Sequence, residues 1–266
     1  MKYSVKSLGL AATTALLASP LQAQQTLDPA IADVANSGDT AWILTASALV
    51  LFMTLPGLAL FYGGLVRAKN FLSVLIQCMA VVGICSLLWI VVGYTLAFGG
   101  VSNGFLGNGM NWMLANLGNV RQATFVPESS FVLFQMTFAV ITPALMIGAW
   151  VERARFGWVV AFCALWSLVV YAPVTHWIWG GGWLSGLGVL DFAGGIVVHT
   201  TAGVSALVVA IMMGKRTGWP KTMMLPHSPA LTVAGAAMLW VGWFGFNGGS
   251  ALTATDDAAA AIINTH

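Results

Sequence analysis

Charge is what this sequence lacks most. Among its 266 residues, 10 are lysine or arginine and 8 are aspartate or glutamate, so charged residues make up 7% of the chain. Soluble domains carry about 25% charged residues, and a chain this poor in charge cannot cover a globule with ionic surface. Hydrophobic residues account for 59%, and the mean hydropathy is +0.87. These values predict an all-α polytopic membrane protein.

Cysteine is also scarce, and its positions exclude a disulfide framework. Cys78, Cys85 and Cys163 all fall inside apolar runs, and an odd, buried set has neither the pairing of disulfides nor the spacing of metal ligands. The net charge of +2 is too small to indicate nucleic-acid binding. We therefore expect no nucleic-acid partner, no metal and no cofactor.

The first residues have the features of a secretory signal peptide. Lys2 and Lys6 precede LGLAATTALLA, an apolar run that is too short to span a bilayer. The small residue Ala23 follows, which predicts cleavage near that position. Residues 1–23 are thus the predicted signal peptide and residues 24–41 a polar periplasmic segment. A retained first helix is the alternative.

Six longer apolar runs follow, each near the ~20 residues that a bilayer-crossing helix needs. They lie at residues 42–62, 71–98, 129–150, 157–179, 192–213 and 229–253. A seventh begins at AAAAIINTH, the last residues of the chain. Residues 42–266 therefore form one predicted membrane domain.

Basic residues are confined almost entirely to alternate loops between these runs. They are Arg67 and Lys69 after the first run, Arg153 and Arg155 after the third, and Lys215, Arg216 and Lys221 after the fifth. Beyond the signal region, only Arg121 lies in the opposite set of loops. The positive-inside rule places the three basic loops in the cytoplasm, which suits a multi-pass protein of the inner membrane.

Two ionisable residues stand out in the stretch DFAGGIVVHTTAG. Asp191 opens the fifth run on the outer side, where a carboxylate suits helix capping or, alternatively, a cation-attracting pore mouth. His199 lies about 12 Å further along a helix axis, near the middle of a ~30 Å hydrocarbon core. An ionisable group at that depth indicates a functional site; the alternative is a neutral histidine satisfied by a neighbouring helix. Gly195 and Gly203 share its helical stripe, which predicts that this face contacts protein.

Aromatic and hydroxyl side chains on other runs fall at matching depths. Trp179 ends the fourth run at the outer surface, and Ser250 lies one turn nearer the outside than Phe246. Phe138 lies about 13 Å into the third run, near the level of His199. A ring face and an acceptor above two phenylalanines and a histidine suit a small cation that enters a dry constriction. Each residue alone could also be an interfacial, self-bonded or packing residue.

Four strings carry a resemblance to a known family: ALFYGGLVRAKN, FQMTFAVITPALMIGAWVERARF, HWIWGGGWLSGLGVLDFAGGIVVH and GWFGFNGGS. They resemble the bacterial branch of the ammonium transporter family (Amt/Mep/Rh), from about Trp42 to the last residue. In that family eleven helices form a subunit, and the subunits assemble as a homotrimer with one pore each. The resemblance implies that about six and a half of those helices are present here.

The resemblance also implies a role for each candidate residue. Trp179, Phe138 and Ser250 match the outer ammonium-recruiting site, Phe138 and Phe246 the gate rings, His199 the first of two pore histidines, and Asp191 a buried aspartate that organises the site. The implied function is channel-like transport of ammonium or ammonia for nitrogen uptake. The family's second pore histidine has no counterpart here, so we expect these 266 residues to be a fragment of a transporter.

Two other classes of function compete with transport. One is an ammonium sensor that signals to a cytoplasmic regulator, and the loop GKRTGWPKTMMLPHS could contact a PII-type signalling protein, as in bacterial relatives. The other is a membrane enzyme. We expect no enzyme, because only one histidine, no metal-ligand cluster and no nucleophile paired with a base are predicted at bilayer depth.

Overall fold

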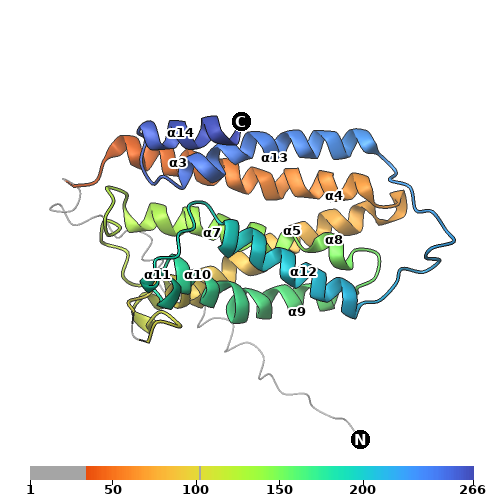
Figure 1. Cartoon of the computed structure of the whole chain (residues 1–266), viewed down its shortest axis with the longest axis horizontal. Helices are drawn as coiled ribbons and strands as arrows, with labels where there is room; N and C mark the ends of the chain where they lie inside the picture. Colours follow the sequence, from red (N-terminus) through yellow and green to blue (C-terminus); the bar gives the residue numbers. More distant parts are fainter. Residues whose placement is uncertain (1–33, 102) are drawn as a thin grey trace, which may run out of the picture.

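The computed structural model describes residues 34–101 and 103–266. These residues form a bundle of roughly parallel and antiparallel helices (Figure 1). Within them, β structure is limited to isolated bridges that join Val101 to Gly107 and Val120 to Pro127. The predicted signal peptide and most of the polar segment that follows it lie outside the described residues.

Six helical segments are long and apolar enough to cross a membrane. They are Ser37–Leu65, Ala68–Phe98, Glu128–Trp150, Phe156–Gly186, Gly195–Met212 and Pro229–Gly249. All six predicted spans are therefore confirmed as helical, and the chain is an all-α, multi-pass membrane protein. The first four segments extend beyond the predicted runs at one or both ends, whereas the fifth and sixth are shorter than the predicted 192–213 and 229–253.

Most spans are composite. The first contains α3 (Ser37–Phe52), a π-helical turn (Met53–Leu58) and α4 (Ala59–Leu65); the second contains a 3-10 turn (Ala68–Asn70), α5 (Phe71–Leu88), a π-helical turn (Trp89–Gly93) and α6 (Tyr94–Phe98). The third contains α7 (Glu128–Ala144) and α8 (Ile147–Trp150); the fourth contains α9 (Phe156–Trp166), a π-helical turn (Ser167–Tyr171), α10 (Ala172–Ile178) and α11 (Trp183–Gly186).

The remaining elements complete the bundle. They are a 3-10 segment in the loop before α7 (Gly109–Leu114), a π-helical turn (Gly195–Thr200) that leads into α12 (Thr201–Met212), α13 (Pro229–Gly249) and α14 (Asp256–Thr265). The predicted seventh run is therefore helical, and α14 lies beside α13 (Figure 1).

Pro56 explains the interruption of the first span. Proline has no backbone N–H and its ring clashes with the preceding helical turn. Leu55, the residue before it, leaves the helical region with φ −131° and ψ 108°. Such interruptions are tolerated in membrane helices where neighbouring protein satisfies the freed backbone groups.

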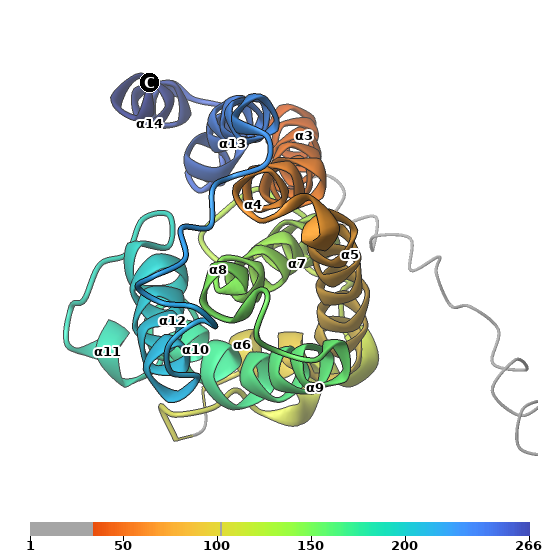
Figure 2. The ribbon, with the colours of Figure 1, turned by 90° about the vertical axis from the view of Figure 1, so that its right-hand side faces the viewer.

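The third span is the centre of the bundle. Figure 2 shows α7 and α8 in the middle, with α3, α4 and α13 above them, α5 to the right, α9 and α10 below and α12 to the left. In the most apolar window of this span 78% of the residues are buried, against 22% to 50% in the other spans. Side chains of α7 therefore contact protein rather than lipid, and a pathway through the bundle must pass beside them.

Glycines let α13 approach α3 and α7 closely. A Cβ atom added at Gly242 would lie 2.1 Å from the Met53 side chain, and one at Gly249 would lie 2.6 Å from the Ala46 Cβ and 2.8 Å from the Phe134 ring. Small residues at such contacts permit close helix packing in membranes. This packing brings the inner face of α13 against α7.

We expect the basic loops to face the cytoplasm. Single cysteines at Arg67, Arg153 and Lys215 should resist a membrane-impermeant thiol reagent applied to intact cells, whereas cysteines at Gly181 and Asp256 should react. The reason is the alternation of basic loops, because basic residues are retained on the cytoplasmic side. Labelling should be compared before and after permeabilisation, and reaction at Arg153 in intact cells would overturn the orientation.

Candidate substrate pathway

A cavity of about 330 Å³ lies beside the first turns of α7 and the residues that directly follow α13. Its lining residues are Phe98, Arg121, Gln122, Ala123, Thr124, Phe131, Phe134, Gln135, Trp179, Asp191, Phe192, Ser250 and Leu252. The structure thus brings three of the predicted site residues, Trp179, Asp191 and Ser250, to one cavity. We call it the outer cavity.

Asp191 organises the backbone at the start of the fifth span. Its Oδ1 atom accepts N–H bonds from Gly194 (2.7 Å) and Gly195 (2.8 Å), and its Oδ2 atom accepts from Ile196 and Val197, both at 2.8 Å. Gly194 is the N-cap residue, with a φ of 103° that glycine adopts without strain. The expected capping bonds are therefore present, although Asp191 makes them from three residues before the cap.

Trp179 and Ser250 are both fixed by hydrogen bonds to the backbone. The Trp179 indole N–H donates to the Asp191 carbonyl oxygen at 2.7 Å. The Ser250 hydroxyl donates to the Phe246 carbonyl oxygen at 2.8 Å. This is a bond to the carbonyl four residues earlier, one of the alternatives that the sequence left open. Since the hydroxyl proton is used in this bond, the Ser250 oxygen keeps its lone pairs as acceptors.

An unbroken row of ring contacts leads from Trp179 to His199. Ring centroids are 5.8 Å apart for Trp179 and Phe138, 4.4 Å for Phe138 and Phe246, and 5.7 Å for Phe246 and His199. Phe138 and Phe246 are 0% and 1% exposed. Phe134 packs on Phe138 at 4.9 Å. Each of the four rings in the row belongs to a different span. Phe138 and Phe246 do not line the outer cavity.

His199 lies at the far end of this row. Its imidazole stacks on the Trp243 ring, with centroids 5.6 Å apart and an interplanar angle of 11°. Within the described ranges neither ring nitrogen takes part in a hydrogen bond, so the stacked ring leaves both nitrogens available for another partner. Among the described residues, therefore, no neighbouring helix supplies a hydrogen bond to the His199 ring.

The described residues leave the glycine stripe beside His199 uncovered, so its predicted contact with protein stays a prediction. Gly195 and Gly203 are exposed, and a Cβ atom added at Gly203 would meet no described residue within 4 Å. Residues Gly195–Thr200 form a π-helical turn, so the helical period over this segment is wider than the regular 3.6 residues on which the stripe was placed.

Two further features of the site were not predicted. Arg121, Phe98 and Phe131 line the outer cavity beside the predicted residues. The one available signal was the position of Arg121, the only basic residue in an outer loop. His176, in α10, is 0% exposed and its Nδ1 atom lies 3.0 Å from the Ala97 carbonyl oxygen. His176 lies within the predicted fourth run, three residues before Trp179, so it is a second histidine within the spans and lies nearer the end of its run than His199 does to the end of its own.

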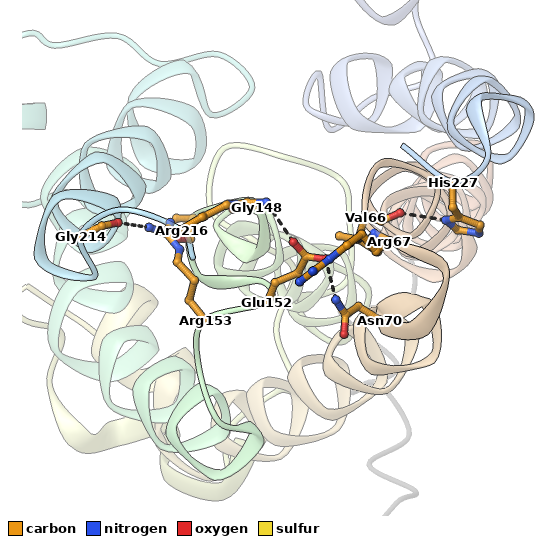
Figure 3. Close-up of polar contacts among 10 residues, drawn as sticks. Val66, Arg67, Asn70, Gly148, Glu152, Arg153, Gly214, Arg216 and His227 are labelled. Carbon is orange, nitrogen blue, oxygen red and sulfur yellow. Dashed lines mark hydrogen bonds and ion pairs between the residues drawn. The ribbon is translucent and has the colours of Figure 1, made fainter. Parts of the chain in front are cut away.

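At the opposite end of the bundle, Glu152 joins the basic loops (Figure 3). Its Oε1 atom accepts from Arg67 Nε at 2.9 Å and from Asn70 Nδ2 at 2.5 Å, and its Oε2 atom accepts from Arg216 Nη1 at 3.3 Å. Glu152 adopts a left-handed φ of 66°, which is costly for a non-glycine residue. The contacts show that three loops separate in sequence meet at one carboxylate, whose side chain is 3% exposed.

We expect acid to weaken this cluster. Burial alone would raise the pKa of Glu152, but hydrogen bonds from Arg67 and Asn70 outweigh it and hold the pKa below the usual range. A carboxyl group with a lowered folded-state pKa contributes stability above its unfolded pKa, near 4.3, and loses it as the pH falls through the folded value. The melting temperature of the purified protein should therefore fall between about pH 5 and pH 3.

The matched variant is Glu152→Gln, which cannot ionise. It should be less stable than the parent at neutral pH by about 1–3 kcal/mol and should show a smaller decline in that acid range. Equal pH dependence in the two proteins would remove Glu152 from the explanation.

Comparisons with known proteins match most of the chain. The model of the Ammonium Transporter Family matches residues 41–266. A putative ammonium transporter of Methanothermobacter thermautotrophicus is 49% identical over 233 residues, which cover 87% of this chain and 56% of that protein. The ammonium transporter of Bacillus subtilis is 48% identical, covering 86% and 56% of the two chains. The chain spans about half the length of the curated relatives it matches.

Solved structures give the same likeness. Candida albicans Mep2 superposes with a TM-score of 0.81 at 38% identity, over 88% of this chain and 52% of that one. A structure titled Sensor Amt Protein superposes with a TM-score of 0.79 at 31% identity, over 85% and 58% of the two chains.

Proposed function

Since this chain belongs to the ammonium transporter family, we propose that the protein carries ammonium or ammonia across the inner membrane along the row of rings. The matched relatives are transporters rather than enzymes. The observation that carries the proposal is the continuity of the row, in which Trp179 borders the outer cavity and His199 ends the series of contacts.

In this proposal the outer cavity recruits the cation. The Trp179 ring supplies a π face, and cation–π contacts contribute about 0.5–2 kcal/mol. The Ser250 oxygen accepts a hydrogen bond from ammonium, because its own proton is donated to the Phe246 carbonyl. Asp191 positions both sides of the site: its backbone carbonyl holds the Trp179 indole, and its carboxylate fixes the start of the fifth span.

Phe138 and Phe246 then form an apolar constriction. A charge at the centre of a membrane costs at least about 2.5–3.5 kcal/mol, and two fully buried phenyl rings offer no polar atom to reduce that cost. The constriction therefore favours neutral ammonia over ammonium. Beyond it, the free nitrogens of His199 can donate a hydrogen bond to ammonia or accept one from it.

We expect the recruiting residues to affect apparent affinity. Trp179→Leu removes the π face and Ser250→Ala removes the acceptor, so each should raise the apparent KM for methylammonium severalfold, in line with contacts of ~0.5–2 kcal/mol. Initial uptake rates in cells that express the complete gene product give the KM. An unchanged KM and rate in the double variant would remove both residues from the pathway.

An ammonium sensor is the second candidate, favoured by the superposition on the structure titled Sensor Amt Protein. Growth rescue separates the two functions. The complete gene product should restore growth of a cell that lacks ammonium transport on low ammonium. A sensor that does not conduct would leave growth unrescued.

The family membership also supports two assembly proposals. We propose that the complete protein forms a homotrimer surrounded by membrane lipid, with one pathway in each subunit. We further propose that a PII-type signalling protein binds the cytoplasmic loops, of which residues 214–228 form the longest. Chemical cross-linking of the purified protein, alone and with a PII-type protein, tests both.

A further inference from the structure

A charged residue outside the proposed pathway, Arg121, borders the outer cavity. Arg121 lines the cavity together with Trp179 and Asp191. A guanidinium group keeps its positive charge at all accessible pH values. An unpaired Arg121 would therefore repel a cation that enters the same space, and the structure raises the question of how that charge is balanced.

A tight loop before α7 holds Arg121 in place. The Arg121 N–H donates to the Val126 carbonyl at 2.8 Å, and the Thr124 N–H donates to the Arg121 carbonyl at 3.0 Å. The Glu128 N–H donates to the Asn119 carbonyl at 2.8 Å. These bonds fix the backbone on both arms of the loop, so the Arg121 and Glu128 side chains have a defined relative position.

Glu128 balances the Arg121 charge from the buried side. Arg121 Nη1 lies 3.2 Å from Glu128 Oε1, and the Tyr94 hydroxyl donates to the same oxygen. The Glu128 side chain is 9% exposed and the Arg121 side chain 21%. The guanidinium carbon also lies 4.4 Å from the centroid of the Phe131 ring and 5.1 Å from that of Phe98. The arginine is thus held between a carboxylate and two aromatic rings.

We infer that the Arg121–Glu128 pair sets the charge of the outer cavity, and that Glu128 keeps the cavity attractive to cations by neutralising Arg121. With the pair intact, one excess negative charge borders the cavity, that of Asp191. Without the Glu128 charge, Arg121 and Asp191 cancel and the net charge at the cavity is zero. Without the Arg121 charge, the negative charges of Asp191 and Glu128 both remain. Glu128 is a positioning and electrostatic residue and does not itself line the cavity. The inference rests on the proposed transport of a cationic substrate.

A purely structural pair gives different results. If Arg121 and Glu128 only anchored the loop on Phe98 and Phe131, loss of either partner would disturb the cavity in the same way. Substitution of each would then impair uptake. The electrostatic role predicts opposite effects, and this difference in sign is the basis of the test.

The test is the apparent KM for radiolabelled methylammonium, measured with the complete gene product in cells at low ionic strength. Arg121→Gln should lower the KM and Glu128→Gln should raise it, each by about two- to fivefold, the effect expected of one unit charge at a partly solvated site. The double variant should return to within about twofold of the parent. All differences should shrink at high salt, because ions screen exposed charges.

The outcomes separate this inference from the proposed function. If the parent neither transports nor binds methylammonium, the proposed function fails and the inference fails with it. If the parent transports but both single variants change the KM in the same direction, or neither changes it, only the inference is overturned. Should Glu128→Gln not reach the membrane, Arg121→Gln decides alone: a lowered KM supports the inference, and an unchanged or raised KM overturns it.

Discussion

Asp191→Ala should abolish uptake by the complete gene product. The substitution leaves four backbone N–H groups without their acceptor and frees the segment whose carbonyl holds Trp179. Hydrogen bonds to a charged acceptor contribute about 1.5–3 kcal/mol each, against a total stability of only about 5–15 kcal/mol. A loss of about 3 kcal/mol already corresponds to more than a hundredfold in an equilibrium. Methylammonium uptake and the yield of folded protein in size-exclusion chromatography measure the effect.

Asp191→Asn is the matched control. It keeps the shape of the side chain and one oxygen acceptor but replaces the other oxygen with a donor, which faces backbone N–H groups. We expect intermediate uptake and a folded yield above that of the alanine variant. Parental uptake by Asp191→Ala would contradict the role of the carboxylate in holding the outer cavity.

His199→Phe should reduce uptake by about ten- to a hundredfold while the protein remains folded. The phenyl ring can keep the stacking contact with Trp243, but both ring nitrogens are lost. Loss of a hydrogen-bonding partner for a buried polar group costs about 1–3 kcal/mol, which is about five- to 150-fold in rate and includes the expected reduction. Uptake rates should be divided by the amount of protein in the membrane.

His199→Gln serves as the conservative variant, because its amide retains a donor and an acceptor. It should recover part of the uptake that His199→Phe loses. If the phenylalanine variant transports at the parental rate, or if the glutamine variant is no better, hydrogen bonding at this position is not required.

The spans and the depths of the central site residues could be predicted from the sequence because they depend only on the position of each apolar run and on the rise of a helix. A run of apolar residues fixes a helix in a bilayer, and helical rise then fixes depth. Helical rise predicts similar depths for Phe138, Phe246 and His199, and the structure places their rings in contact. The family resemblance added the roles, which residue depth alone does not define.

Features set by irregular backbone could not be predicted in the same way. The position of Arg121 over Phe131 depends on the fold of a loop that carries no periodicity. Glu152 contacts residues of two other loops, and its backbone adopts a left-handed conformation that favours glycine. The π-helical turn at Gly195–Thr200 also departs from the regular helical period that the sequence pattern assumes. In each case tertiary contacts determine a local geometry that the sequence pattern does not encode.

The most direct test of transport along the row of rings is flux through the purified complete protein in sealed proteoliposomes. Ammonium is added outside, and its accumulation is followed with an internal enzymatic assay. Vesicles with the parent protein should accumulate ammonium faster than empty vesicles, and vesicles with His199→Phe should lose most of that difference. Parent protein that is folded and reconstituted yet gives the rate of empty vesicles would contradict the account.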